Sequence, residues 1–348
     1  MKTSEIKGGW LTVNRMCNMR CPWCYASAVG YAGDASMPPD LAKHLVDLFY
    51  NLGVTNMIIL GGEPTIYPHL EEIIRYSVDK NIRPIIVTNG RAFANQAYAS
   101  SLLSTGLRDL TISLKAVEED GYSLLAVSGQ SGLFNEVCTA IKNTQTLGYK
   151  LNISVTLVRS LYDKLHDLVD LLSSFGPCHV TIDMGSPVVT PNGMDPKGIL
   201  DPLELSRALT VLHGLLRTTS VDYSYYVSIP LCILDQCTRE SMIKEGRILT
   251  TCHVPKGSGL IFTPDGSVIL CNHFSSFPIA KYGVDFNTAE EFAAFWYSDR
   301  VKEVRSRVTT YPHPNCRDCT DWNICGGGCF VKWLQWDPND YIVKKERR

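Results

Sequence analysis

The stretch CNMRCPWCY, residues 17–25, carries the strongest structural information in this chain. It places Cys17, Cys21 and Cys24 within eight residues, and an aromatic residue, Tyr25, follows directly. Three thiolates are one fewer than the four that complete a structural zinc or iron–sulfur site. The pattern therefore predicts an incomplete set of metal ligands, which leaves one metal position open for another molecule.

Bulk composition excludes several classes of protein. The chain has 348 residues, 45% of them hydrophobic and 20% charged, which is ordinary for a globular protein with a substantial core. A formal net charge of −2 gives no electrostatic argument for binding nucleic acid or an anionic membrane. No apolar run approaches the roughly 18 residues of a membrane helix, and the first residues lack the apolar segment of a signal peptide. We therefore expect a cytoplasmic protein.

The number of cysteines is unusual for such a protein. There are thirteen, and six of them lie between Cys252 and Cys329. In a reducing compartment, clustered thiols more often hold metal or carry out redox chemistry than form disulfides. The spacing assigns no role to the four scattered cysteines, which are Cys138, Cys178, Cys232 and Cys237.

Short apolar runs alternate with helical stretches over the first 200 residues. Strands are expected at 10–14, 56–60, 84–88, 109–114, 151–158 and 179–184, and helices at 38–53, 69–79, 94–105, 133–147 and 161–175. Strands joined through helices form a parallel sheet. Six units are too few for a closed eight-stranded barrel, so we expect an α/β fold, a partial (β/α)6 barrel with its functional loops at the carboxyl ends of the strands.

The composition changes along the rest of the chain. We expect the partial barrel to span residues 1–200 and a helical linker to span 201–245, with a helix at 203–217. Residues 246–348 are rich in cysteine and turn residues, and they predict a small second domain. Within it, TPDGSVILC (263–271) predicts a β-hairpin that turns at Asp265 and Gly266.

The Cys-x3-Cys-x2-Cys spacing followed by Tyr25 resembles the signature of the radical S-adenosylmethionine (SAM) superfamily. The resemblance implies that Cys17, Cys21 and Cys24 hold a [4Fe-4S] cluster, that SAM chelates the remaining iron, and that Tyr25 packs beside the adenine. It also implies reductive cleavage of SAM to a 5′-deoxyadenosyl radical, which takes a hydrogen atom from the substrate, with electrons from an external donor of the flavodoxin or ferredoxin type. An apolar barrel lumen suits this chemistry.

Other positions extend the resemblance over roughly residues 10–185. The sequence GGEP follows the second strand, where the family holds the methionine amino group. The third and fourth strands end in VTNG (87–90) and TISLK (111–115). By resemblance, SAM contacts are expected from Gly61, Gly62, Glu63, Pro64, Asn89, Ser113, Lys115 and Arg159. For the last three a solvent-facing or structural role is the open alternative.

The downstream cysteines resemble those of the SPASM or twitch extension of radical SAM enzymes, which carries auxiliary iron–sulfur clusters. The resemblance implies one or two such clusters, held by Cys252, Cys271, Cys316, Cys319, Cys325 and Cys329. The full SPASM pattern has a seventh cysteine after these, and none follows Cys329 here.

Several ligand arrangements remain open for this region. The six thiolates can divide three and three, with an open position or a non-cysteine ligand on each cluster. Alternatively, Cys252, Cys271, Cys316 and Cys319 form a single twitch-like cluster. Cys232 and Cys237 are candidates for recruitment in either case. The candidate non-cysteine ligands are His253, His273, His313, Asp337 and Asp340.

Enzymes that resemble this chain most often modify ribosomally made precursor peptides. They form thioether, carbon–carbon or cyclophane crosslinks or excise residues. In sulfatase maturases an aspartate follows the hairpin cysteine, and here that residue is Asn272. Only nine residues precede the first expected strand, too few for a leader-binding domain. We therefore expect a precursor peptide substrate, whose leader is recognised by a separate protein or whose core is recognised directly. The alternatives are oxidation or epimerisation of a small molecule such as an aminosugar, and a non-catalytic metal-binding module. The catalytic base cannot be identified from the sequence.

Overall fold

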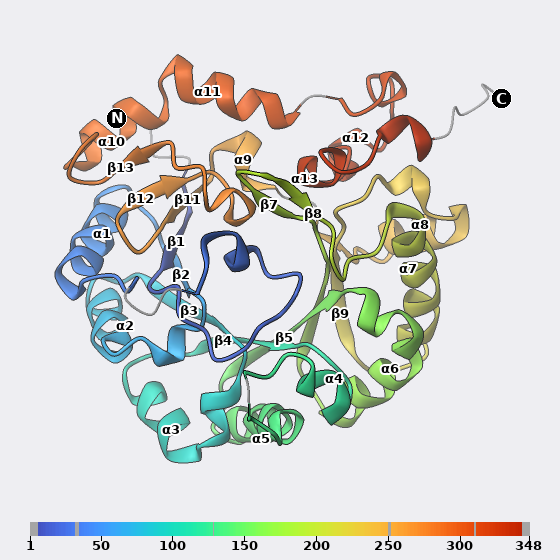
Figure 1. Ribbon diagram of the computed structural model, residues 1–348, viewed down its shortest axis with the longest axis horizontal. Coiled ribbons are helices and arrows are strands. Elements are labelled where there is room, and N and C mark those ends of the chain that lie inside the picture. The colour runs from blue at the N-terminus through green and yellow to red at the C-terminus, as the bar shows by residue number, and fades with distance from the viewer. Residues whose placement is uncertain (1–5, 32–34, 128, 250–251, 310, 343–348) are drawn as a thin grey trace.

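The computed structural model describes residues 6–31, 35–127, 129–249, 252–309 and 311–342. Its centre is a curved parallel sheet of six consecutive strands surrounded by helices (Figure 1). The strands are β1 Gly8–Thr12, β2 Asn56–Leu60, β3 Arg83–Thr88, β4 Asp109–Leu114, β5 Lys150–Leu157 and β6 His179–Met184. Each strand pairs in parallel with the next one in sequence, as the predicted partial barrel requires.

The helices on the outside of the barrel follow the predicted periodicity. They are α1 Pro39–Asn51, α2 Leu70–Asp79, α3 Gln96–Ser104, α4 Glu119–Ser123, α5 Leu133–Thr146, α6 Leu165–Ser174 and α7 Pro202–Leu216. The α6 helix begins later than predicted because residues Arg159–Lys164 form a 3-10 turn before it. The first strand begins earlier than predicted, because Gly8 and Gly9 pair with neighbours on both sides despite the weak strand propensity of glycine.

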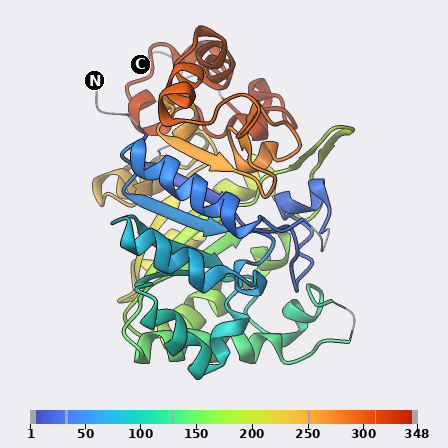
Figure 2. The same ribbon diagram turned by 90° about the vertical axis from the view of Figure 1, so that its left-hand side faces the viewer.

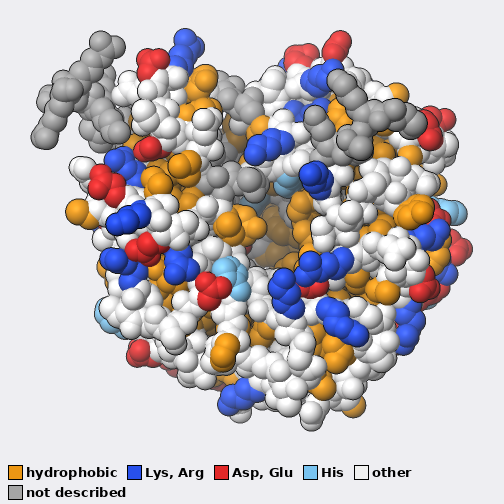
Figure 3. All heavy atoms as spheres, turned by 180° about the vertical axis from the view of Figure 1, so that it is seen from behind, with side chains coloured by type: hydrophobic (Ala, Val, Ile, Leu, Met, Phe, Trp, Pro, Cys, Tyr) orange, Lys and Arg blue, Asp and Glu red, His pale blue; other side chains and the backbone are white. Residues whose placement is uncertain are grey.

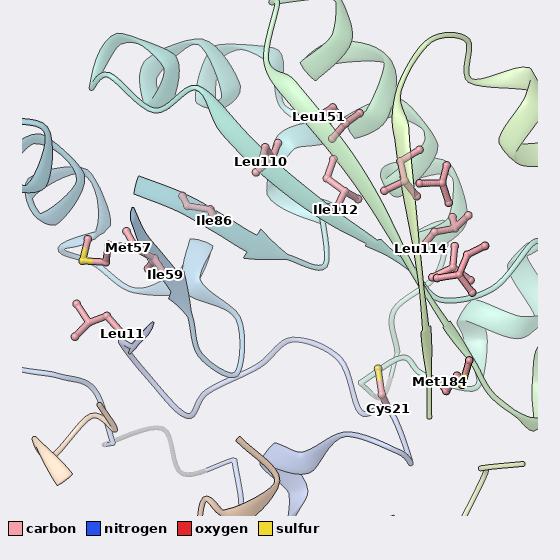
Figure 4. Packing of buried hydrophobic residues seen from close by; sticks show 14 of the residues in the cluster. Leu11, Cys21, Met57, Ile59, Ile86, Leu110, Ile112, Leu114, Leu151 and Met184 are labelled. Carbon is pink, nitrogen blue, oxygen red and sulfur yellow. The ribbon is translucent and has the colours of Figure 1, made fainter. Parts of the chain in front are cut away.

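Alternate residues of each strand face the helices and the barrel lumen, because side chains along a strand alternate with a period of two. The residues that face the helices are apolar and buried (Figure 4). Those that Figure 4 labels on β1 to β5 are Leu11, Met57, Ile59, Ile86, Leu110, Ile112, Leu114 and Leu151. This layer between sheet and helices holds the strands in register, so that their carboxyl ends meet at one rim.

Additional strands extend the sheet at both edges, to eleven strands within the described residues. At one edge, β9 (Asp222–Tyr226) pairs in parallel with β6, and β10 (Ile248–Leu249) pairs with β9. The segment expected to be a helical linker therefore contains two helices, α7 and α8 (Gln236–Lys244), and also the strand β9, which joins the sheet. A short antiparallel pair, β7 (Val188–Thr190) and β8 (Gly193–Asp195), stands apart from this sheet.

At the other edge, β11 (Gly259–Phe262) pairs in parallel with β1. It continues into β12 (Ser267–Ile269) as the predicted antiparallel hairpin, and Gly266 has a positive φ of 81° in the turn. Beyond it lie β13 (Ala280–Lys281) and the short helices of the cysteine-rich region. These are α9 His253–Lys256, α10 Ala289–Trp296, α11 Asp299–Ser306, α12 Trp322–Cys325 and α13 Phe330–Trp333. Figure 2 shows this region on one side of the barrel.

Besides the pairing of β11 with β1, two hydrogen bonds join the cysteine-rich region to the barrel side of the molecule. The Lys332 ammonium group, which is fully buried, donates to the backbone oxygen of Gly185, just after β6. The backbone N–H of Cys329 donates to the Ser228 oxygen at 2.8 Å, just after β9. Among the helices of the described ranges, none is long and apolar enough to cross a membrane.

Candidate active site at the carboxyl ends of the strands

A cavity of about 730 Å³ lies at the carboxyl ends of the strands and extends into the lumen. The loop that follows β1 crosses the middle of the barrel (Figure 1), and Figure 3 shows a hollow near the centre of the opposite face. Cys17, Cys21 and Cys24 all line this cavity, and so does Tyr25. The fold therefore brings the residues of the CNMRCPWCY stretch to the rim where parallel α/β folds place their sites.

Gly61 and Gly62 are required by the contact between two loops. An added Cβ on Gly62 would lie 2.2 Å from the Met16 oxygen and 2.4 Å from the Arg15 oxygen, and on Gly61 it would lie 2.3 Å from Asn14 Oδ1. The Gly62 N–H donates to the Asn14 oxygen at 3.0 Å, and the Glu63 N–H donates to the Met16 oxygen at 2.8 Å. The glycine pair therefore presses the loop after β2 against the loop that carries the cysteines.

The Glu63 carboxylate joins the loop after β2 to the end of β3 through hydrogen bonds. Its side chain is buried, and one carboxylate oxygen accepts bonds from Thr65 N–H at 3.1 Å, Thr65 Oγ1 at 2.8 Å and Thr88 Oγ1 at 2.6 Å. The other oxygen accepts the Asn89 N–H at 2.8 Å. Pro64 begins a short 3-10 turn, Pro64–Ile66, beside it. The Glu63 carboxylate thus links the ends of β2 and β3.

Asn14 and Asn89 complete this bracing. The Asn14 side chain is fully buried and donates to the Glu63 backbone oxygen at 2.9 Å. The Asn89 side chain donates to Asn18 Oδ1 at 2.7 Å, within the cysteine loop. Asn14 was not among the predicted site residues. An asparagine at the end of an apolar strand is nevertheless a recognisable signal, because a buried amide needs hydrogen-bond partners.

Ser113 and Lys115, at the end of β4, both line the cavity. Burial acts to lower the pKa of the Lys115 ammonium group, but nearby thiolates and Glu63 outweigh it and raise that pKa above its ordinary value. Burial in turn raises the pKa of the Cys17 thiol to about 11. Lys115 is therefore a half-buried positive charge near the three cysteines, where it favours negatively charged ligands.

Two tyrosines complete the cysteine loop. Tyr25 opens the 3-10 turn Tyr25–Val29, and its ring meets that of His273 edge-on, with the ring centres 6.2 Å apart. Tyr31 also lines the cavity, and its hydroxyl forms a hydrogen bond with the Cys24 thiol. Tyr31 was not among the predicted site residues, because its distance along the chain from Cys24 carries no known pattern.

Arg159 lies elsewhere. It forms an exposed bidentate ion pair with Glu204 in the first turn of α7, and it does not line the cavity. The structure therefore places eight of the nine residues predicted to contact SAM at or beside the rim, and Arg159 outside it.

The lumen wall is divided by polarity, and only half of it is the apolar surface that was expected. The residues of β1 to β3 deeper in the lumen are apolar, namely Trp10, Ile58, Leu60, Ile85 and Val87. Those of β4 to β6 are polar, namely Thr111, Ser113, Asn152, Ser154, Thr181 and Asp183. A ligand in this cavity therefore meets an apolar surface on one side and hydrogen-bonding groups on the other.

Asp183 is the second carboxylate in the cavity wall, besides Glu63. Burial raises the pKa of its carboxyl group to about 6. Perturbed carboxyl groups in a cavity are candidates for function. The sequence analysis overlooked it, although an aspartate inside the apolar strand HVTIDM (179–184) is an available signal.

The downstream cysteines form two groups. Burial, together with the neighbouring Cys329 and Cys252 thiolates, raises the pKa of the Cys271 thiol to about 12. Cys316, Cys319 and Cys325 form the second group, because burial and then the other two cysteines of this group act on the Cys325 thiol. Cys138 and Cys178 belong to neither group, and both are half-buried.

The donor chemistry of these sites fits iron–sulfur clusters. All thirteen cysteines are free thiols, and thiolates are the ligands that such clusters require. Within the described part of the chain, no group of three or more His, Cys, Asp or Glu side chains is arranged around a single metal ion. A four-iron cluster is larger than one ion, so its ligands stand further apart, and this observation is compatible with a cluster at each group.

Known proteins resemble this chain in sequence and in fold. A model of the Radical SAM superfamily matches residues 11–172. Fe-coproporphyrin III synthase of Methanosarcina barkeri is 28% identical over 160 residues, 46% of this chain and 39% of that protein. GTP 3′,8-cyclase of Xanthomonas axonopodis pv. citri is 26% identical over 285 residues, 72% of this chain and 81% of that protein. The first of these matches thus spans about two-fifths of the relative's own length.

A solved structure gives the same fold over nearly the whole chain. Streptococcus suis SuiB bound to S-adenosylmethionine superposes with a TM-score of 0.68 at 18% identity, covering 98% of this chain and 75% of SuiB. The fold and the rim define the class as a partial-barrel α/β protein with three free thiols, Cys17, Cys21 and Cys24, at the carboxyl ends of its strands. Residues 11–172, somewhat less than half of the chain, match the Radical SAM superfamily, and the fold of the chain is that of SuiB.

Proposed function

We propose that this chain is a SPASM-type radical SAM enzyme that modifies a residue of a ribosomally made precursor peptide. The observation that carries the proposal is the shared cavity lined by the Cys17, Cys21 and Cys24 thiols and by the Gly61–Gly62 turn. The three thiols hold the [4Fe-4S] cluster. When bound, this cluster and SAM supply a 5′-deoxyadenosyl radical that removes a hydrogen atom from the substrate.

The protein's own residues bind and orient SAM. Both oxygens of the Glu63 carboxylate already accept protein hydrogen bonds, so we assign the SAM ammonium group to the backbone oxygens of Gly61 and Gly62. Lys115 is the cation on the cavity wall that fits the SAM carboxylate, and Ser113 donates beside it. Tyr25, which lines the same cavity, would pack beside the adenine.

A peptide substrate is supported by the likeness to SuiB, which includes the cysteine-rich region. SuiB has also been solved bound to its precursor peptide SuiA. By analogy, the substrate here is a peptide. We propose that a separate protein recognises its leader or that its core is recognised directly, and that an external flavodoxin-type or ferredoxin-type donor supplies electrons. Auxiliary clusters at the two downstream groups of cysteines would accept an electron or contact the substrate.

Asp183 is assigned to the substrate. It lies on the polar side of the lumen, and Tyr226 of β9 lies near enough to interact with its charge. A carboxylate whose pKa is raised to about 6 by burial can accept a proton near neutral pH. We propose that Asp183 contacts the reacting residue of the substrate and accepts the proton released on modification.

The experiment uses reduced, cluster-loaded enzyme with SAM and each candidate short peptide encoded beside the gene. Peptide-dependent formation of 5′-deoxyadenosine, with a change in peptide mass, is the expected result. A Cys17/Cys21/Cys24→Ala variant is the control and should form neither product. If fully loaded enzyme forms no 5′-deoxyadenosine with any substrate, a non-catalytic metal-binding module replaces this proposal.

A small-molecule substrate is the second candidate, and the sequence relatives favour it. GTP 3′,8-cyclase matches 72% of this chain, and its name describes chemistry on a nucleotide. The polar wall of β4 to β6 suits such a ligand. Formation of 5′-deoxyadenosine with GTP, with a porphyrin or with an aminosugar, and not with peptides, would establish this alternative.

A further inference from the structure

The segment between β9 and α8 is attached to the cysteine-rich region through backbone groups. The Leu231 N–H donates to the Cys325 thiol sulfur at 3.3 Å. Gly328 packs so closely on this segment that an added Cβ would lie 2.9 Å from the Ser228 oxygen, and its φ is +80°. In Figure 1 the yellow chain before α8 and the red α12 and α13 lie on the same side of the molecule.

Cys232 follows directly after the residue that contacts Cys325. It is the middle residue of a 3-10 turn, Leu231–Ile233, which fixes the direction of its side chain relative to that contact. The Cys232 side chain is exposed at the surface, and desolvation by its neighbours together with the nearby Cys325, Cys316 and Cys319 thiolates raises the pKa of its thiol to about 11. All three residues of the second downstream group therefore act on Cys232, whereas Cys252, Cys271 and Cys329 form the other group.

We propose that Cys232 is the fourth protein ligand of an auxiliary iron–sulfur cluster held by Cys316, Cys319 and Cys325. The inference rests on the proposed function, because it assumes that this group of cysteines holds a cluster. It gives this group a fourth thiolate from the segment between β9 and α8, whose backbone already contacts Cys325. Each thiol loses its proton as it binds iron, as metal binding by cysteine requires.

The assignment gives the two downstream sites different properties. The group of Cys232, Cys316, Cys319 and Cys325 is a closed set of four thiolates, which suits a cluster that only transfers electrons or braces the fold. Cys252, Cys271 and Cys329 are three, so one iron there has no cysteine ligand. By the reasoning applied to the first cluster, the open site is the one that can bind another molecule.

The test measures alkylation of the wild-type holoprotein under anaerobic conditions. Reconstituted protein is treated with iodoacetamide, and each cysteine is read by peptide mass spectrometry before and after the clusters are removed with a chelator and oxidant. Cys237 is the internal control, because it is exposed as Cys232 is, lies five residues further along the chain, and is the second residue of α8. A thiolate bound to iron is not free to react as a nucleophile.

We expect Cys232 to be alkylated at least about tenfold more slowly with the clusters than without them, while Cys237 reacts alike in both states. Alkylation of Cys232 in the holoprotein while Cys316, Cys319 and Cys325 stay protected overturns the inference but leaves the auxiliary cluster intact. If all four cysteines are alkylated in the holoprotein, this group holds no cluster, and both the inference and this part of the proposed function are wrong.

Variants give a second, independent measurement. In a Cys17/Cys21/Cys24→Ala background, iron bound to the auxiliary sites is counted for Cys232→Ala and Cys237→Ala. We expect Cys232→Ala to lose about one to four iron per chain, or to show a three-iron signal by electron paramagnetic resonance, and Cys237→Ala to lose none. Equal iron and equal spectra in the two variants overturn the inference.

Discussion

The Glu63 carboxylate is predicted to stabilise the protein even before any cofactor binds. Glu63→Gln replaces one carboxylate oxygen with an amide nitrogen and removes the negative charge. The amide oxygen can take the place of the oxygen that accepts from Thr65 and Thr88. The amide nitrogen then faces the buried Asn89 N–H, and two donors meet where a charged acceptor stood.

The expected loss follows from these contacts. A hydrogen bond to a charged group contributes about 1.5–3 kcal/mol, and leaving a buried donor unpaired costs about 1–3 kcal/mol. Because these two values describe overlapping effects, we expect Glu63→Gln to lower the free energy of unfolding by about 2–4 kcal/mol. For a chain of this size, that is a decrease of several degrees in melting temperature.

The assay is thermal unfolding of the cluster-free protein at neutral pH, followed by SAM binding to the reconstituted protein. The control is Glu72→Gln, which removes an exposed ion pair with Lys43 and should leave the melting temperature unchanged. If Glu63→Gln melts with the wild type but binds SAM more weakly, the carboxylate acts on the cofactor and the bracing role assigned to it is wrong.

Three further predictions concern the glycine pair, the lumen carboxylate and the exposed arginine. Gly62→Ala forces the two rim loops apart, so we expect the free energy of unfolding to fall by about 1–3 kcal/mol and less iron to bind at the Cys17, Cys21 and Cys24 site. The control is Gly214→Ala in α7, which has open space around it and should stabilise the protein. Asp183 has a folded-state pKa of about 6, above its ordinary 3.8, so ionisation destabilises the folded protein as pH rises from about 4 to 6. Asp183→Asn should therefore be up to about 3 kcal/mol more stable than wild type at pH 8 and as stable as wild type at pH 3. Its activity should lack the rise that the wild type shows near pH 6. Equal unfolding curves of the two proteins at pH 8 would contradict this prediction. Arg159→Ala removes only the exposed pair with Glu204, so calorimetry should find SAM affinity unchanged, and weaker binding would restore the role predicted from the sequence.

The sequence by itself determined the features that depend on local pattern. Each strand and helix of the barrel is encoded by the apolar period of its own residues, so most strands and helices lie within two residues of their predicted bounds. The cysteine loop could also be predicted from the sequence. Cys17, Cys21 and Cys24 lie within eight residues, so they stay close together whatever the arrangement of the rest of the chain. The hairpin at Asp265 and Gly266 was predictable for the same reason, since its turn residues are adjacent in the chain.

Only the tertiary structure decided which distant residues meet. The sequence predicts that Glu63 contacts a ligand, but two of its partners, Thr88 and Asn89, lie at the end of β3. Their distance from Glu63 is set by the pairing of whole strands. The sequence predicts Arg159 at the rim of the barrel, but in the structure it forms an ion pair with Glu204, in the first turn of α7. The grouping of Cys329 with Cys271, and of Cys232 with Cys325, depends on how the cysteine-rich region packs on the segment after β9. Such contacts join residues about 25 to 94 positions apart, and no local period records them.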